Sequence, residues 1–176
     1  MFQSFYPYAY ADSVFTIDYQ RLYDKGFRGL IFDIDNTLVH HGDDATPEIE
    51  ALFRKLHAIG WKTLLLSNNN RERTERFAKN IDTQIICDAD KPDPAGYLHA
   101  VEMLQIRKEE ALVIGDQMFT DILGANRCGL ASILVHFIRL EGETKIGKKR
   151  YLEFALLKLW RHNKKFCTRL GDVEIK

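Results

Sequence analysis

Short apolar runs alternate with helix-like segments through most of the chain. Five apolar runs predict buried strands, in the first part of Gly29–Leu38 and then at Trp61–Leu66, Gln84–Cys87, Ala111–Ile114 and Ala131–Val135. The segments between them predict helices at Tyr19–Lys25, Pro47–Ile59, Arg71–Lys79, from Pro94 onward and at Asp121–Cys128. Strands and helices that alternate through short links are typical of a doubly wound, right-handed parallel sheet. We therefore expect an α/β fold with helices on both faces of the sheet.

The ends of the predicted helices carry recognisable local signals. Thr46-Pro47 resembles an N-cap followed by proline at the first helical position, and Gly60 can end the same helix. Asp18 can cap the first short helix. Residues 1–16 are rich in Phe and Tyr, and we expect an arm that packs on the domain, with membrane or partner contact as the alternative.

Polar side chains recur where the predicted strands end. They are Asp33, Asp35, Thr37, Ser67, Lys91 and Asp116. Because the carboxyl ends of parallel strands open onto one crevice, we expect these side chains to converge. Carboxylates hold Mg²⁺ through a few contacts and leave its other positions to water and phosphate. The residues therefore predict a metal-dependent site for phosphoryl chemistry.

The same positions resemble the motifs of the haloacid dehalogenase (HAD) superfamily. Asp33-Ile34-Asp35-Asn36-Thr37 matches the DxDxT motif, Ser67 the second motif and Lys91-Pro92 the third. Gly115-Asp116-Gln117-Met118-Phe119-Thr120-Asp121 matches the GDxxxxD form of the fourth. DxDxT alone is a weak signal, whereas four motifs in the right order are a specific one. The resemblance implies a HAD-like Rossmannoid fold and a phosphatase.

The resemblance also implies a role for each aspartate. Asp33 would be the nucleophile that forms an aspartyl-phosphate, and Asp35 would protonate the leaving oxygen and then activate water. Mg²⁺ would bind the Asp33 carboxylate, the Asp35 backbone carbonyl and Asp116. Asp121 would orient Lys91 or support the metal, with an early helix acid as the alternative. An acid at position 35 is typical of the superfamily's phosphatases, whereas its transport ATPases carry threonine there.

A second set of residues would bind the transferring phosphoryl group. The expected set is Thr37, Ser67, Asn68 and Lys91. A turn or cap role is the alternative for Asn68, and Gly115 is expected to support the site. His40 and His41 follow the first motif and are read as solvated loop residues, or as contacts for a leaving group.

The spacing of the motifs leaves no room for a large cap domain. Between Thr37 and Ser67 there are 29 residues, and between Ser67 and Lys91 there are 23. Each interval holds one predicted helix and its turns. An open site suits a phosphate carried on a large molecule, or a cover supplied by a neighbouring subunit in an oligomer.

Charge divides the chain unevenly although the net charge is zero. Residues 144–170 hold nine Lys or Arg and one acid, a net of +8, which leaves −8 on the remainder. Within this segment Leu152, Leu156, Leu159 and Trp160 can share one helical face. We predict a phosphatase domain at 1–143 and a basic amphipathic extension at 144–176. Such a helix can lie peripherally on an anionic membrane, or dock on the sheet with a solvated basic edge; nucleic acid has no support beyond charge.

The cysteine pattern and hydropathy indicate a cytoplasmic protein. Cys87, Cys128 and Cys167 are widely separated and form no CxxC pair, which favours reduced thiols. The chain opens without a signal-peptide pattern, and no uncharged apolar run reaches the ~18 residues of a membrane span. We therefore expect a cytoplasmic enzyme, with peripheral contact at the inner face of the membrane as a further expectation.

Taken together, the motifs are similar to the YqeG-like group of HAD subfamily IIIA. The similarity also includes the stretch Asp18-Tyr19-Gln20-Arg21-Leu22-Tyr23-Asp24-Lys25-Gly26 and Thr144-Lys145-Ile146, and it covers roughly residues 2–150. The group is similar to phosphatidylglycerophosphate phosphatases, which implies a lipid phosphate or another bulky phosphate as substrate. A soluble nucleotide or sugar phosphate is the alternative substrate. A phosphoryl-accepting receiver or a non-catalytic regulator on the same fold is the rival class, and Asp35 counts against the receiver.

Overall fold

The protein is built around a six-stranded sheet in which every strand is parallel to its neighbours, in the order β1-β6-β5-β2-β3-β4. The structure is a computed structural model, and it describes residues 2–140, 142 and 147–175. The strands are β1 (Ala9–Ala11), β2 (Gly29–Phe32), β3 (Lys62–Leu66), β4 (Gln84–Ile86), β5 (Ala111–Gly115) and β6 (Ala131–Val135). The strand order reverses at β2, which lies between β3 and β5, so the switch point of the fold lies at its centre.

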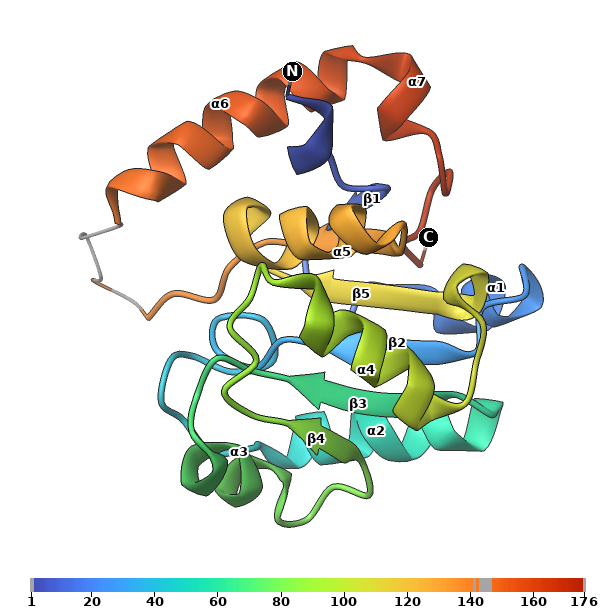
Figure 1. Cartoon of the computed structure of the whole chain (residues 1–176), viewed down its shortest axis with the longest axis vertical. Coiled ribbons are helices and arrows are strands. Elements are labelled where there is room, and N and C mark those ends of the chain that lie inside the picture. Colours follow the sequence, from blue (N-terminus) through green and yellow to red (C-terminus); the bar gives the residue numbers. More distant parts are fainter. Residues whose placement is uncertain (1, 141, 143–146, 176) are drawn as a thin grey trace.

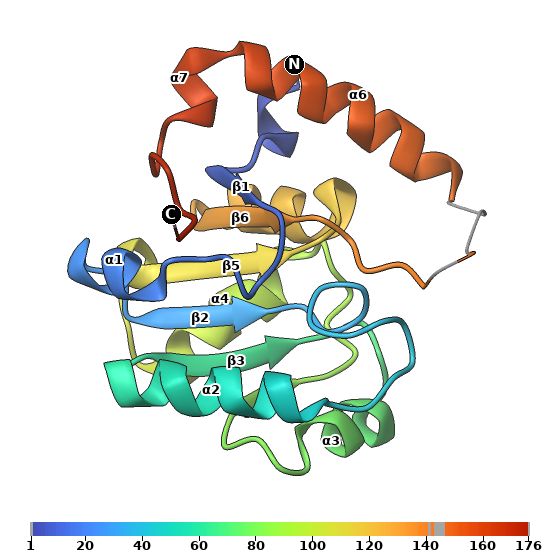
Figure 2. The same ribbon diagram turned by 180° about the vertical axis from the view of Figure 1, so that it is seen from behind.

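Helices cover both faces of this sheet, as predicted. The α-helices are α1 (Tyr19–Asp24), α2 (Pro47–Ile59), α3 (Arg71–Ala78), α4 (Pro94–Leu104), α5 (Leu123–Cys128), α6 (Lys148–His162) and α7 (Lys164–Cys167). Figure 1 shows α4 and α5 in front of the sheet, and Figure 2 shows α2 on the opposite face. Helices α6 and α7 lie beyond β1, at the edge of the sheet, in both views.

Strand β2 shows how the sequence builds the two cores. Successive side chains of a strand point to opposite faces. Accordingly, Leu30 and Phe32 pack in the core that α2 covers, where the Phe32 ring lies 5.4 Å from that of Phe53. Ile31 packs in the other core, together with Tyr97 of α4. All four residues of β2 are buried, which explains its continuous apolar run.

Most predicted elements are found within one residue of their predicted ends. Thr46 caps α2 by accepting the N–H of Ile49, and Gly60 ends that helix in the left-handed region at φ 111°. Asp18 caps α1 by accepting the N–H of Arg21. In the described part of the chain, the interval from Thr37 to Ser67 holds α2 and β3, the interval from Ser67 to Lys91 holds α3 and β4, and neither holds a cap domain.

Two elements differ from the prediction. The aromatic arm contains a short strand, β1, that pairs with β6 from Ala9↔Ile133 to Ala11↔Val135. The helix expected at Asp121–Cys128 begins earlier, because a π-helical turn at Met118–Ile122 precedes α5. A three-residue strand among aromatics and a wider helical turn both lack a periodic signal long enough to detect.

The C-terminal segment packs against the N-terminal arm. The indole Nε1 of Trp160 donates to Pro7 O at 2.8 Å, and Arg169 donates to Tyr6 O at 2.8 Å. Further on, Leu170 and Val173 enter the larger core. The predicted boundary at residue 143 and the segment 144–146 lie outside the described residues, so the division into 1–143 and 144–176 stays a prediction. Among the residues described, no helix is both long and apolar enough to cross a bilayer.

Candidate active site

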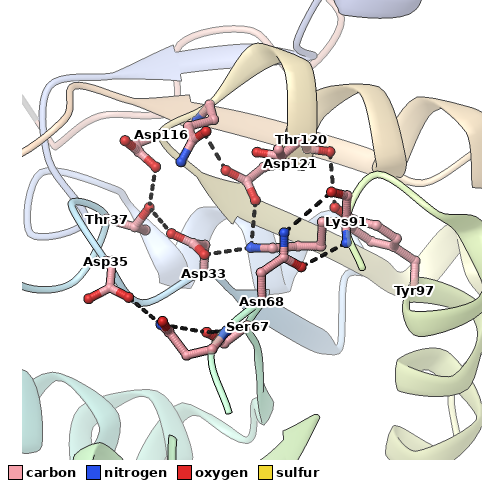
Figure 3. Close-up of polar contacts among 12 residues, drawn as sticks. Asp33, Asp35, Thr37, Ser67, Asn68, Lys91, Tyr97, Asp116, Thr120 and Asp121 are labelled. Atoms are coloured by element: carbon pink, nitrogen blue, oxygen red, sulfur yellow. Dashed lines mark hydrogen bonds and ion pairs between the residues drawn. The ribbon is translucent and has the colours of Figure 1, made fainter. Parts of the chain in front are cut away.

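The ends of three central strands bring the predicted site residues together. In the parallel register, Phe32 of β2 pairs with Leu65 of β3 and with Ile114 of β5. The residues that follow these strands, Asp33, Ser67 and Asp116, therefore leave the same edge of the sheet. Figure 3 shows them around one centre, together with Thr37, Lys91 and Asp121.

A cluster of buried carboxylates forms the middle of the site. One oxygen from each of Asp33, Asp116 and Asp121 lies within 4.8 Å of the others. Burial raises the pKa of Asp33 to about 6, against the opposing effect of the Lys91 ammonium. Burial and the carboxylates of Asp33 and Asp121 raise the pKa of Asp116 to about 8. The site thus concentrates more negative charge than it compensates, and hard carboxylate oxygens at this spacing suit a divalent cation such as Mg²⁺.

Lys91 is the internal cation of the cluster. Its Nζ donates to Asp33 Oδ1 and, at 2.8 Å, to Asp121 Oδ1. Only 4% of its side chain is exposed. Burial opposes its charge, but the carboxylates of Asp121 and Asp33 outweigh this effect and raise the pKa of Lys91. Lys91 therefore stays charged beside Asp33 at any physiological pH.

Asp121 has no oxygen free of a protein hydrogen bond, since Oδ1 accepts from Lys91 and Oδ2 accepts the N–H of Gln117 at 3.0 Å. Its carboxylate also lies directly against Gly115, where an added Cβ would come within 2.4 Å of Asp121 Cγ. The π-helical turn places Asp121 in this position. The contacts of Asp121 therefore connect it to Lys91, and Gly115 provides the space that the Asp121 carboxylate needs.

Asp35 lies apart from the carboxylate cluster. Its oxygens accept the N–H of Gly42 at 2.9 Å, the Arg73 guanidinium at 3.1 Å and the amide of Asn69. Burial alone raises the pKa of Asp35, but these hydrogen bonds and the charge of Arg73 outweigh it and lower the pKa below its ordinary value. Asp35 therefore rests in the ionised form, which is the form needed to take a proton from water.

The expected phosphate-binding residues make different contacts. The Thr37 hydroxyl lies 3.0 Å from Asp33 Oδ2 and 3.3 Å from Asp116 Oδ1. Ser67 Oγ accepts the backbone N–H of Asn69 at 3.1 Å. The amide of Asn68 contacts the main chain of Lys91, with its Oδ1 2.7 Å from Lys91 N. Asn68 therefore holds the segment that carries Lys91.

A cleft of about 170 Å³ opens beside these groups. Asp33, Asp35, Ser67 and Lys91 line it, and His41 lies at its rim with Nδ1 3.6 Å from Asp35 Oδ1. A larger hollow of about 410 Å³ lies near Lys62 and Gln105, at the other end of the strands, where no carboxylates cluster. The chemistry therefore belongs to the smaller cleft.

Sequence reasoning missed several residues that contact the site, among them Asn69, whose amide donates to Asp35 and to Ser67. Arg73 binds Asp35, while Arg150 of α6 donates to Asp116 Oδ2 and to Glu153. Arg73 stands in a polar helix and Arg150 in a basic run, where each resembles an ordinary solvated charge. Glu153, the single acid of that run, was the available signal, because a lone acid among bases on a helix face suggests an ion pair.

The parallel sheet and the clustered carboxylates with their internal lysine define an α/β enzyme of phosphoryl-transfer type. The comparisons agree. A family model described as "Hydrolase: haloacid dehalogenase-like hydrolase" matches residues 40–129, just after the Asp33–Thr37 stretch. The chain belongs to this family, and it is a phosphatase-type enzyme within it.

Relatives and solved structures support the same assignment. The chain is 36% identical over 132 residues to "Probable phosphatase YqeG" of Bacillus subtilis, covering 74% of this chain and 77% of that protein. It is 30% identical over 165 residues to "Phosphatidylglycerophosphate phosphatase 1, chloroplastic/mitochondrial" of Arabidopsis thaliana, covering 88% of this chain and 47% of that protein. The chain therefore spans about half the length of the plant relative.

The structural neighbours show the fold alone, because their sequences are distant. A protein from Listeria monocytogenes matches with a TM-score of 0.53 and 20% identity, over 78% of this chain and 100% of that one. A putative beta-phosphoglucomutase from Thermotoga maritima matches with a TM-score of 0.52 and 16% identity, over 77% and 99%. The predicted HAD-like α/β fold is confirmed.

Proposed function

We propose that the protein is a Mg²⁺-dependent phosphomonoesterase of subfamily IIIA that acts on a lipid phosphate of the phosphatidylglycerophosphate class at an anionic membrane surface. The observation that carries the chemistry is the placement of Asp33, Lys91 and Asp116 at the switch point of the sheet, with Asp35 lining the same cleft as Asp33 and Lys91. Faster hydrolysis of a soluble phosphomonoester than of the lipid phosphate would change the proposed substrate class.

In the first half-reaction an Asp33 carboxylate oxygen attacks phosphorus. The bond from phosphorus to the alcohol oxygen breaks, and that oxygen takes a proton from Asp35, which first binds one from the solvent because its resting form is ionised. The Lys91 ammonium supplies positive charge next to the phosphoryl oxygens, and the hydroxyls of Thr37 and Ser67 can donate hydrogen bonds to them. Because Lys91 is already bound to Asp33, the nucleophile and the main cationic donor approach the phosphate together.

In the second half-reaction Asp35 removes a proton from water, and the hydroxide attacks the phosphorus of the aspartyl-phosphate. The acyl-phosphate bond breaks, inorganic phosphate leaves, and the Asp33 carboxylate is restored. The proton taken from water leaves Asp35 in the protonated form that the next first half-reaction uses, and it exchanges with the solvent when the enzyme returns to rest. The depressed pKa of Asp35 favours this base step.

Asp33 and Asp116 are the side chains that would hold Mg²⁺, with the backbone carbonyl of Asp35 as a third ligand. Asp121 belongs to the same cluster, but its oxygens serve Lys91 and the Gln117 N–H. When bound, the ion supplies charge that offsets the repulsion between a carboxylate nucleophile and a phosphate dianion.

The outer surface of α6 supports a membrane-bound substrate. Tyr151, Leu152 and Leu159 are 62%, 55% and 50% exposed, and the exposed Lys148 and Lys158 lie on the same helix. Exposed apolar side chains among lysines are typical of helices that lie in an anionic interface. The first turn of the same helix reaches Asp116 through Arg150, so this end of α6 lies close to the carboxylate cluster. The name of the plant relative agrees with a lipid phosphate substrate.

The test measures phosphate release from phosphatidylglycerophosphate in anionic vesicles and from p-nitrophenyl phosphate, with Mg²⁺ and with EDTA. We expect release from both, a strong preference for the lipid, and no release by Asp33→Asn. If neither substrate released phosphate with Mg²⁺ present, the enzymatic proposal would be refuted. A preference for soluble monoesters would refute the lipid assignment.

Membrane contact is tested by cosedimentation with anionic and with phosphatidylcholine vesicles. The double variant Lys148→Gln/Lys158→Gln should lose binding to anionic vesicles. The matched variant Lys55→Gln/Lys79→Gln removes the same charge from exposed positions in α2 and at the C-cap of α3, and it should bind as the wild type does. Equal losses of vesicle binding in both variants would show a general effect of charge and would refute the proposal that α6 is the membrane-binding surface.

A further inference from the structure

Helix α6 contributes two residues that hold the loop carrying Asp116. Arg150 Nη1 donates to the main-chain O of Asp116 at 2.7 Å, and Nη2 donates to Asp116 Oδ2. Nη1 also donates to Glu153 Oε2 at 2.9 Å. Glu153 Oε1 accepts the N–H of Met118 at 2.8 Å. The helix is therefore bonded to the chain at Asp116 and again two residues later.

These contacts are buried and geometrically defined. The side chain of Arg150 is 14% exposed and that of Asp116 is fully buried. The guanidinium also lies over the ring of Phe137, with its Cζ 4.6 Å from the ring centre. A planar guanidinium that binds two oxygens of one residue restricts the position of that residue more than a single donor can. Arg150 thus fixes both the main chain and the carboxylate of Asp116.

The two oxygens of Asp116 consequently face different partners. Oδ2 is held by Arg150, whereas Oδ1 lies 3.3 Å from the Thr37 hydroxyl, on the side of Asp33. Figure 3 shows the bonds that run from Asp116 through Thr37 to Asp33. The oxygen that Arg150 leaves available is the one directed into the carboxylate cluster.

We propose that Arg150 is a positioning residue for the metal site, which makes α6 a working part of the active site. Arg150 holds Asp116 Oδ2 so that Oδ1 is presented to a divalent cation, and Glu153 holds Arg150. This inference rests on the proposed metal-dependent function. Helix α6 would then have two roles: its outer face contacts a membrane, and its inner face positions Asp116.

Charge and position have opposite effects on cation binding, so the decisive variant must keep the charge. Loss of a positive charge near a cation site favours the cation, while loss of an orienting partner typically weakens metal binding by about 10- to 100-fold. Arg150→Lys keeps the charge and removes the two-point contact. We expect Arg150→Lys to bind Mn²⁺ about 10-fold more weakly than the wild type, and Glu153→Gln to show a smaller loss.

The measurement is a titration of the metal-free full-length protein with Mn²⁺, followed by the electron paramagnetic resonance signal of free Mn²⁺. Arg161→Lys is the matched control, because it makes the same exchange at an exposed position of the same helix. It should bind Mn²⁺ as the wild type does. Circular dichroism melts identify any variant that fails to fold. If Arg150→Lys does not fold, Mn²⁺ binding by Glu153→Gln is compared with that of the wild type instead.

Steady-state kinetics provide the second readout. In Arg150→Lys the Mg²⁺ concentration for half-maximal phosphate release should rise about 10-fold, while KM for p-nitrophenyl phosphate at saturating Mg²⁺ stays close to that of the wild type. If Arg150→Lys and Glu153→Gln bind Mn²⁺ as tightly as the wild type, the inference is overturned while the phosphatase proposal stands. A wild-type protein that binds Mn²⁺ but releases no phosphate overturns the phosphatase proposal and leaves the binding comparison valid.

Discussion

The side-chain amide of Asn68 is paired with the main chain of Lys91. Asn68 Oδ1 accepts the N–H of Lys91 at 2.7 Å, and Asn68 Nδ2 donates to Lys91 O at 3.3 Å. Asn68, the second residue after β3, therefore fixes the start of the segment that carries Lys91. Its sequence position suggested phosphate binding, while its contacts suggest that it acts through Lys91.

Asn68→Ala should lower kcat by about 10- to 100-fold, because a displaced Lys91 no longer meets the phosphoryl group in the productive geometry. The measurement is steady-state hydrolysis of p-nitrophenyl phosphate at saturating Mg²⁺, with a thermal melt to confirm folding. Asn80→Ala, which removes an exposed amide bonded to Glu50, is the matched control and should keep wild-type kcat. Equal kcat in both variants would contradict a role for Asn68 in positioning Lys91.

Asp35→Asn should separate the two half-reactions. The p-nitrophenolate group leaves without needing a proton, so Asp33 can still be phosphorylated, whereas water loses its base. General-base catalysis contributes about 10²- to 10⁴-fold, so the steady rate should fall by that order. We expect a burst of p-nitrophenolate equal to the enzyme concentration, followed by slow turnover, in a stopped-flow experiment. A slow steady rate without a burst would contradict a base role confined to the second step.

The fold was predictable because the local signals of its main elements agree with one another. Helix α2 has a capping threonine, a proline at its first position, an apolar stripe and a terminal glycine, and each signal agrees with the others. Strand β2 is a continuous apolar run because it is buried on both faces. The edge strand β1 escaped prediction because three residues among aromatics carry no period, and its pairing with β6 depends on tertiary contacts.

The convergent residues of the site were predictable from their place after strands, since topology alone brings strand ends together. The supporting residues were not. Arg73 and Arg150 lie on helices that reach the site from elsewhere in the chain, 38 residues from Asp35 and 34 residues from Asp116. Nothing local distinguishes Arg73 from a solvated charge, and the lone acid Glu153 indicates an ion pair for Arg150 but not its bond to Asp116, so only the packing of those helices shows their partners in the site.

Gly115→Ala should destabilise the protein by about 1–3 kcal/mol, the usual cost of forcing a methyl group into a packed interior. The new Cβ would lie within 2.4 Å of Asp121 Cγ, so Asp121 must move and release Lys91. Urea unfolding measures the loss, and activity should fall with it. Gly147→Ala is the matched control, because nothing lies within 4 Å of its added Cβ. A Gly115→Ala protein as stable as Gly147→Ala would contradict this close contact.

The stability of the metal-free protein should depend on pH through Asp116. Its pKa is about 8 in the folded protein against an ordinary value of 3.8, owing first to burial and then to the charges of Asp33 and Asp121, with Arg150 opposing. Between these values the folded state binds more protons than the unfolded state, so the free energy of unfolding falls as pH rises. Asp116→Asn removes this dependence. In EDTA, its Tm relative to the wild type should therefore increase from about pH 5 to about pH 7.5.

Thermal melts followed by circular dichroism across that range measure the difference, with Asp82→Asn as a control that removes one exposed carboxylate. Saturating Mg²⁺ should stabilise the wild type at the upper pH, because the cation binds the ionised Asp116 carboxylate and neutralises the charge that a proton neutralises at low pH. The stability of Asp116→Asn should change little on addition of Mg²⁺. Parallel Tm curves for wild type and Asp116→Asn in EDTA would show that Asp116 is ionised in the folded protein throughout. In that case the surrounding charges, Arg150 first among them, would already balance the carboxylate cluster before any metal binds.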